Sequence, residues 1–279
     1  AQTRRSGRKK VMLETKVKKS ISKDKEHKED NIKIPKERIT MEYEKALPKH
    51  NWERTYKLIQ EQRSTITAPV DEIGCSELAN KENPTPVWRY QVLIGHMLSS
   101  QTKDEVTHKA MLKLQEFGLT PEKISEIDED KLIELIKGVR FYNRKAKHIK
   151  EATEIIIKKY EGDIPETVKE LTKFKGVGMK MAVNTVNLAW GQTVGIGVDV
   201  HLHRICNRLG WVKTDSPDET REDLREWLPK DKWKEINPLL SGFGQMICTA
   251  RNPKCAECKV SHLCPSSTTK EKQEELKEE

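Results

Sequence analysis

Hydrophobic residues recur with helical spacing through most of the chain between residues 48 and 267. In the segment 143–160, for example, Ile149, Ala152 and Ile156 form one apolar stripe, and most of the positions between them are polar. A spacing of three or four residues places such side chains on one face of an α-helix. This pattern predicts helices over most of the chain, joined by short turns.

Cap and turn signals agree with a helical chain. Thr102 and Glu105 have the spacing of a capping box, which predicts a helix that begins there and ends at Gly118. Ser216 repeats the cap signature farther along the chain. The β-branched run 194–198 is short and contains two glycines, which disfavours a strand. The sequence therefore predicts an all-α fold.

The sequence Gly176-Val177-Gly178 lies between two segments with helical spacing, 165–174 and 182–191. Two glycines allow a tight turn, and they expose backbone N–H groups at the start of the second helix. Such a hairpin can hold a DNA phosphate without reading the base sequence. The motif indicates a helix-hairpin-helix, with a plain helical hairpin as the alternative.

Lys180 and Asp199 are the two candidate catalytic residues. Lys180 lies in the first turn of the helix after the hairpin, where the positive end of the helix disfavours an ammonium group. An amine nucleophile would explain a lysine there, and a solvated surface charge is the alternative. Asp199 precedes an apolar-faced helix and is predicted to be its N-cap, which would hold the carboxylate rigid for a second role.

Four cysteines with gaps of six, two and five residues form the most specific motif: Cys248, Cys255, Cys258 and Cys264. Four thiolates on one short loop can bind Zn²⁺ or a [4Fe–4S] cluster. Zinc sites usually use two CxxC pairs and this loop has one, so the spacing favours the cluster. Arg251 and Lys254 lie between the first two cysteines and could contact phosphates.

The positive charge of the chain is concentrated at its N-terminus. The net charge is +8, and residues 1–50 hold 16 Lys and Arg against 8 Asp and Glu, so residues 51–279 are neutral overall. Residues 1–47 are predicted to be a disordered basic tail, serving nuclear import or DNA contact, and 268–279 an acidic tail. No apolar run is long enough for a membrane span or a secretory signal.

Taken together, four segments resemble the endonuclease III family of DNA repair glycosylases, within the helix-hairpin-helix superfamily. They are the cysteine loop and three others: Leu98-Ser99-Ser100-Gln101-Thr102, Phe174-Lys175-Gly176-Val177-Gly178-Met179-Lys180 and Gly197-Val198-Asp199-Val200-His201. Their order and spacing agree with the family over residues 50–267. The basic tail is similar to that of the eukaryotic homologues.

The resemblance implies two helical lobes with the active site in the cleft between them. Residues 84–193 would form a six-helix barrel that ends with the helix-hairpin-helix. Residues 48–83 and 194–267 would form the second lobe, which holds the [4Fe–4S] cluster. Lys180 and Asp199 would then face each other from opposite lobes.

The resemblance also implies a bifunctional DNA glycosylase and AP lyase that removes oxidised pyrimidines such as thymine glycol. Lys180 would attack C1′ of the flipped nucleotide and form a Schiff base, Asp199 would support the cationic sugar, and β-elimination would nick the strand. The DNA contacts implied are Gln101, which would insert its side chain into the vacated stack, and Lys175, Gly176, Val177, Gly178, Arg251 and Lys254, with Phe141 near a second wedge position. The substrate would be double-stranded DNA with a damaged base or an AP site, bound by a monomer in the nucleus or the mitochondrion.

Two other functions are alternative interpretations of the sequence. An adenine or mismatch glycosylase of the same superfamily normally lacks the lysine and carries a further domain, whereas here Lys180 is present and fifteen residues follow Cys264. A non-catalytic iron–sulfur DNA-binding module would keep the hairpin without the chemistry. The sequence departs from the family pattern at Phe174–Lys175, Val200 and Arg140, and Arg140 replaces a common glycine beside Phe141.

Overall fold

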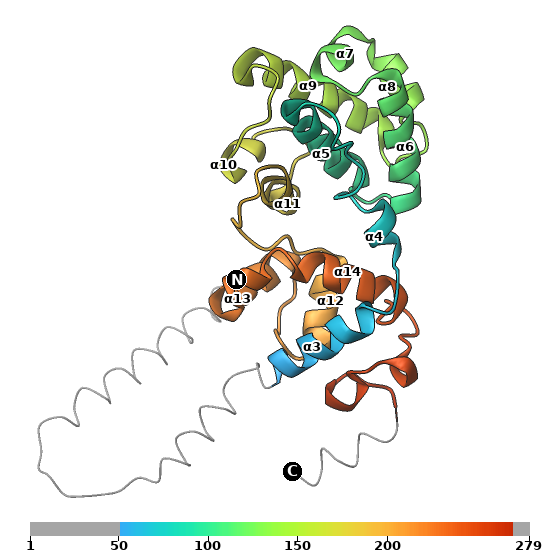
Figure 1. Cartoon of the computed structure of the whole chain (residues 1–279), viewed down its shortest axis with the longest axis vertical. Helices are drawn as coiled ribbons and strands as arrows, with labels where there is room; N and C mark the ends of the chain where they lie inside the picture. The colour runs from blue at the N-terminus through green and yellow to red at the C-terminus, as the bar shows by residue number, and fades with distance from the viewer. Residues whose placement is uncertain (1–50, 270–279) are drawn as a thin grey trace, which may run out of the picture. The chain divides into compact units, whose positions relative to one another are not determined.

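The computed structural model describes residues 51–269 (Figure 1). Over this range the chain forms twelve α-helices and three short 3-10 helices, and its only β-type pairing is an isolated bridge between Lys137 and Val139. This confirms the predicted all-α fold. The predicted tail 1–47, and residues 270–279 of the predicted acidic tail, lie outside the described residues.

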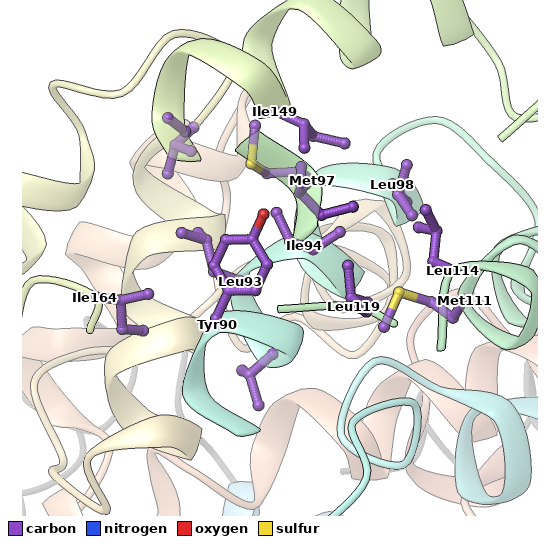
Figure 2. Close-up of a cluster of buried hydrophobic side chains, with 14 of the residues drawn as sticks. Tyr90, Leu93, Ile94, Met97, Leu98, Met111, Leu114, Leu119, Ile149 and Ile164 are labelled. Atoms are coloured by element: carbon purple, nitrogen blue, oxygen red, sulfur yellow. The ribbon is translucent and has the colours of Figure 1, made fainter. Parts of the chain in front are cut away.

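Seven helices surround the larger of two hydrophobic cores: α5 (Thr85–Ser99), α6 (Asp104–Phe117), α7 (Pro121–Glu126), α8 (Glu129–Leu135), α9 (Tyr142–Tyr160), α10 (Val168–Leu171) and α11 (Met179–Ala189). The helix α5 is central, because every residue from Tyr90 to Leu98 is buried. Figure 2 shows Tyr90, Leu93 and Ile94 of this helix within the cluster. A helix that is apolar on all sides is one that neighbours cover completely.

The smaller core is built from both ends of the described chain. Its helices are α3 (Trp52–Arg63), α12 (Val200–Arg208), α13 (Pro217–Trp227) and α14 (Ile236–Met246). The 3-10 helix Lys230–Lys232 lies between α13 and α14, and two more, Cys255–Glu257 and Ser261–Leu263, follow α14. Aromatic rings of Tyr56 and Trp211 stack at its centre, with centroids 6.4 Å apart. Edge-to-face and stacked rings add to the stabilisation from burial alone.

The short helix α4 (Pro69–Ile73) contacts α6 from the larger core and α14 from the smaller one. The described residues belong to one compact unit. The two cores agree in kind with the two expected lobes, while the boundaries 48–83, 84–193 and 194–267 stay a prediction. No helix within residues 51–269 is long and apolar enough to cross a membrane.

Helix ends test the local predictions. The helix expected over 143–160 is α9, Tyr142–Tyr160, and Ser216 is the N-cap of α13, accepting a hydrogen bond from the Glu219 N–H. The helix expected over 165–174 is shorter, Val168–Leu171, because the Thr167 side chain caps it and single turns continue the chain to Phe174.

The predicted capping box at Thr102 is wrong. Lys103 is the N-cap of α6, without a side-chain hydrogen bond. The Thr102 hydroxyl instead donates to the Ser100 carbonyl at 3.2 Å and accepts the Arg140 N–H at 3.3 Å. Long-range partners therefore use the side chain that the local pattern assigned to a cap.

Candidate functional site

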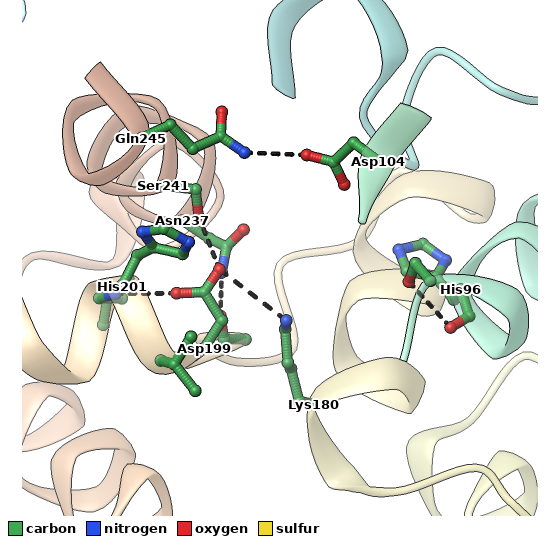
Figure 3. A network of polar contacts seen from close by, with 12 residues as sticks. His96, Asp104, Lys180, Asp199, His201, Asn237, Ser241 and Gln245 are labelled. Atoms are coloured by element: carbon green, nitrogen blue, oxygen red, sulfur yellow. Dashed lines mark hydrogen bonds and ion pairs between the residues drawn. The ribbon is translucent and has the colours of Figure 1, made fainter. Parts of the chain in front are cut away.

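Lys180 and Asp199 meet where the two cores approach each other. Lys180 is the second residue of α11, and its Nζ lies 3.8 Å from Oδ2 of Asp199, the N-cap of α12 (Figure 3). The lysine side chain is 47% exposed and the aspartate side chain 13%. A solvent-accessible amine is thus placed against a nearly buried carboxylate.

Both oxygens of Asp199 are fixed by hydrogen bonds. Oδ1 accepts the Leu202 N–H at 2.8 Å, which confirms the predicted helix cap. Oδ2 accepts the hydroxyl of Ser241, a buried residue of α14, at 2.7 Å. The N-terminal end of α12 also favours a negative charge. The carboxylate is therefore held in one orientation, with Oδ2 facing Lys180.

Gly197, two residues before Asp199, lies against side chains from both α14 and α11. The Gly197 carbonyl accepts a hydrogen bond from the Asn237 side chain on α14. On its other side, a Cβ at Gly197 would lie 1.8 Å from Oδ1 of Asn184 on α11. A larger residue at 197 would have to displace the Asn184 side chain, so residues from both cores set the path of the chain into Asp199.

A second polar contact joins the cores near the same place. The Gln245 side chain on α14 donates to Oδ2 of Asp104, the first residue of α6, at 2.8 Å, and accepts the Val70 N–H at 3.1 Å (Figure 3). Burial raises the pKa of Asp104. Neither Gln245 nor Ser241 belongs to a local motif, and the sequence analysis missed both.

The histidine beside Lys180 on the larger core is a buried neutral side chain. Nδ1 of His96 lies 2.9 Å from the Val92 carbonyl one turn earlier on α5. Burial lowers the pKa of His96 to about 4 from its ordinary 6.5, and the positive charge of Lys180 acts in the same direction. His96 is therefore an uncharged residue of the larger core at neutral pH.

The predicted hairpin places its residues in different environments. Gly176 has a φ of 82°, and a Cβ there would lie 2.5 Å from Nδ1 of His148 on α9. Val177 is buried in the larger core, so only its backbone is available to a ligand. Gly178 is the N-cap of α11, with open space around it. Lys175 is exposed, and its Nζ forms a 3.1 Å ion pair with Glu151.

The two predicted wedge residues lie in exposed turns. Gln101 follows the end of α5 with a φ of 53°, and Phe141 precedes α9 with a φ of 59°. The Phe141 side chain is 44% exposed, and the guanidinium groups of Arg140 and Arg144 lie 5.0 and 4.8 Å from its ring centre. An exposed aromatic ring flanked by two cations suits a nucleic acid, which offers base faces and phosphates.

All four cysteines of the predicted metal loop line one pocket of the smaller core: Cys248, Cys255, Cys258 and Cys264. Within residues 51–269, no group of three or more His, Cys, Asp or Glu side chains is arranged to hold a single metal ion. Burial raises the pKa of Cys258 to about 11 and raises that of Cys264, so metal binding must displace protons there.

Arginine side chains connect the cysteine loop to α12. Arg208 donates to the Cys248 sulfur at 3.2 Å and to the Thr249 carbonyl at 2.7 Å. Arg204 donates to the Cys248 carbonyl at 2.8 Å, and its Nη2 lies 3.2 Å from Nδ1 of His201. A donor set of four sulfurs with a cation beside one of them fits an anionic iron–sulfur cluster.

The remaining predicted DNA contacts are exposed, and the two other cysteines are buried or partly buried. Arg251 and Lys254 are exposed on the loop between the first two cysteines of the motif. Cys206 is fully buried in the smaller core, and burial raises its pKa. Cys75 is partly buried, with its sulfur 3.8 Å from the Gly95 carbonyl.

Two family models match the sequence. The HhH-GPD superfamily of base excision DNA repair proteins matches residues 94–230, which include Lys180 and Asp199. The iron-sulfur binding domain of endonuclease III matches residues 248–264, which begin and end at cysteines of the motif. The second match confirms the predicted [4Fe–4S] cofactor.

Known proteins agree with these family matches. Endonuclease III-like protein 1 of Gallus gallus is 49% identical over 219 residues, covering 78% of this chain and 78% of that protein. Endonuclease III homolog 1, chloroplastic, of Arabidopsis thaliana is 48% identical over 228 residues, and these cover 79% of this chain and 60% of that protein. The structure of a trapped endonuclease III–DNA covalent intermediate has a TM-score of 0.66 at 28% identity, over 77% of this chain and 96% of the other. This chain therefore belongs to the endonuclease III family and is a base excision repair DNA glycosylase and AP lyase.

Proposed function

We propose that this enzyme removes oxidised pyrimidines, such as thymine glycol, from double-stranded DNA, with Lys180 as the nucleophile. The observation that carries the proposal is the 3.8 Å approach of the Lys180 amine to an Asp199 carboxylate whose two oxygens are already fixed. A solved structural neighbour is a trapped covalent complex of endonuclease III with DNA, which supports a covalent route.

The steps follow from an amine and a carboxylate at this distance. Lys180, as the free amine, forms a bond from Nζ to C1′, and the bond between C1′ and the base breaks with its electron pair leaving on the base, which takes up a proton. Asp199 accepts a proton from the attacking nitrogen and stabilises positive charge on the sugar. The C1′–O4′ bond then breaks with its electron pair leaving on O4′, which takes the proton held by Asp199, and the opened sugar carries a protonated Schiff base between C1′ and Nζ.

Strand cleavage uses the same intermediate. Loss of a proton from C2′ expels the 3′ phosphate with its electron pair, which breaks the DNA strand by β-elimination. Water then hydrolyses the Schiff base, releasing an unsaturated aldehyde on the DNA end and restoring the Lys180 amine. No oxidant or reductant is consumed, so the steps balance without a redox cofactor.

Several placed groups would hold the DNA for this chemistry. Backbone N–H groups around Gly176 and Gly178, together with the Lys175 side chain, would bind phosphates, and the exposed Gln101 and Phe141 turns would enter the duplex. Arg251 and Lys254 would contribute further phosphate contacts. The four cysteines would hold the [4Fe–4S] cluster, which, when bound, cross-links the loop that carries these two cations.

Borohydride trapping tests the nucleophile. Reduction of the Schiff base should attach the enzyme covalently to duplex DNA containing thymine glycol, and Lys180→Ala should abolish the product. Lys180→Gln should also lose strand cleavage, because an amide cannot form a Schiff base. Full cleavage by the Lys180→Gln enzyme would contradict the proposal. A panel of lesions in the same assay would show whether oxidised pyrimidines are preferred, or whether mismatched adenine is the substrate.

We further propose that the enzyme is imported into the nucleus, because the basic cluster in residues 1–47 resembles an import signal, and that it acts as a monomer. Fluorescence microscopy of the tagged chain, with and without residues 1–47, tests the nuclear localisation. Exclusion of the intact chain from the nucleus, or accumulation in mitochondria, would contradict it. Light scattering of the enzyme with and without duplex DNA tests the monomer, which a dimer mass would contradict.

A further inference from the structure

Two exposed turns on the larger core share an uncommon backbone conformation. Gln101 and Phe141 have φ values of 53° and 59°, in the left-handed region that side chains other than glycine rarely adopt. Such residues persist only where their surroundings impose the conformation. The contacts that hold these turns therefore decide how the two side chains are presented.

Lys145 on α9 is buried between the two turns. Its Nζ donates to the Leu98 carbonyl at 2.6 Å, to the Ser100 carbonyl at 2.7 Å and to the Thr102 hydroxyl at 3.2 Å. Residue Lys145 is 8% exposed, and all three N–H groups of its ammonium are used on the chain that surrounds Gln101. Within residues 51–269, Lys145 forms no ion pair with a carboxylate, so these carbonyl and hydroxyl oxygens hold its charge.

The same lysine also reaches the second turn. Its backbone N–H donates to the Phe141 carbonyl at 3.0 Å, which closes the first turn of α9. The Thr102 hydroxyl that contacts Nζ of Lys145 also accepts the Arg140 N–H at 3.3 Å. Lys145 and Thr102 thus connect the Gln101 turn to the Arg140–Phe141 turn through the interior, although 38 positions separate Thr102 from Arg140.

We propose that Lys145 is a positioning residue that fixes the Gln101 and Phe141 turns as one unit, so that both side chains enter the DNA together. Burial disfavours the ammonium form of a lysine, and it lowers the pKa of Lys145 to about 8. The shift agrees with the enclosed position of this side chain. The inference rests on the proposed function, because that function is what brings these two turns into contact with a duplex.

The chain offers a matched control on the same helix. Lys150 also lies on α9, and its Nζ also donates to three acceptors, the carbonyls of Ile124, Ser125 and Ile127 at 3.0, 2.9 and 2.6 Å. These acceptors lie at the end of α7, and no residue there has a positive φ. Lys145→Met and Lys150→Met therefore remove the same kind of hydrogen bonding, next to the exposed turns or away from them.

The test compares two reactions of the full-length holoenzyme under single-turnover conditions. One is base release from a thymine glycol duplex, which needs the nucleotide to leave the stack. The other is cleavage of an AP site in single-stranded DNA, which does not. We expect Lys145→Met to lower the ratio of the first rate to the second by about tenfold or more, since misplacement of about 1 Å can cost a hundredfold. Lys150→Met should keep the wild-type ratio at a comparable loss of melting temperature.

Fluorescence of 2-aminopurine beside the lesion reports unstacking directly, and Lys145→Met should reduce its rise on binding. If Lys145→Met does not fold, Thr102→Val removes the shared hydroxyl, and Thr102→Ser should restore both the ratio and the fluorescence. An unchanged ratio and signal in the folded Lys145 or Thr102 variants would overturn the inference. Absence of a borohydride-trapped complex with the wild-type enzyme would instead refute the proposed function, so the two failures are distinguishable.

Discussion

Asp199→Asn separates the two roles of the aspartate at the end of α12. Asparagine still presents one oxygen to the Leu202 N–H, which the aspartate now holds at 2.8 Å, and asparagine is as good an N-cap as aspartate. The substitution removes the negative charge that faces Lys180 at 3.8 Å. It also changes the partner of Ser241, whose hydroxyl would have to accept from an amide instead of donating to a carboxylate.

The expected magnitudes differ for folding and for chemistry. The cap is kept, so the free energy of unfolding loses the charge–dipole term, the exposed ion pair with Lys180 and the charge assistance to the Ser241 hydrogen bond. The first two are small in solvent because the lysine is 47% exposed, and the three together are about 1–2 kcal/mol. Loss of a preorganised charge beside the reacting atoms costs about 3–4 kcal/mol in the transition state, which is about a hundred- to a thousandfold in rate.

Thermal unfolding and single-turnover base release measure the two effects on the same protein. Ser216→Ala is the control, because Ser216 caps α13 through a 3.2 Å bond from the Glu219 N–H. It should cost about 1 kcal/mol of stability and leave the rate unchanged. If Asp199→Asn kept the wild-type rate of base release, whatever its melting temperature, the charge of Asp199 would have no part in the chemistry.

Three further predictions concern pH, the cluster and salt. His96 has a pKa of about 4 in the folded protein and 6.5 in the unfolded chain. The unfolded chain therefore binds a proton more readily, and the free energy of unfolding falls by about 3 kcal/mol as the pH drops from 6.5 to 4. His96→Gln should flatten the melting temperature over that range, and an unchanged slope would assign the loss to other groups. Arg208→Met removes the 3.2 Å contact to the Cys248 sulfur, so the visible iron–sulfur absorption should bleach about ten times faster in chelator; a wild-type half-life would show that the contact does not matter. Deleting residues 1–47 removes most of the net positive charge, so the slope of log affinity for DNA against log salt should become shallower. The rate of single-turnover base release should not change. An unchanged slope would show that residues 1–47 do not contact DNA.

Local sequence patterns are sufficient for the features that depend on neighbours a few positions apart. A helix needs only a spacing of three or four residues and a cap, so α9 and the cap at Asp199 follow from local pattern. The cysteine loop and the glycine hairpin are equally local, because their ligands or N–H groups lie on one short segment. These local motifs alone indicate the family.

Tertiary structure decided everything that depends on partners far along the chain. Ser241 lies 42 positions from Asp199, and Lys145 lies 43 from Thr102, and neither pairing has a spacing that a sequence pattern records. Thr102 shows the consequence: its capping signature is local, but the hydroxyl is used by Lys145 and Arg140 instead. Buried donors need hydrogen-bond acceptors, and tertiary packing determines which acceptors are within reach. The side chains that hold Asp199 and the two exposed turns therefore depend on the fold and not on the local sequence.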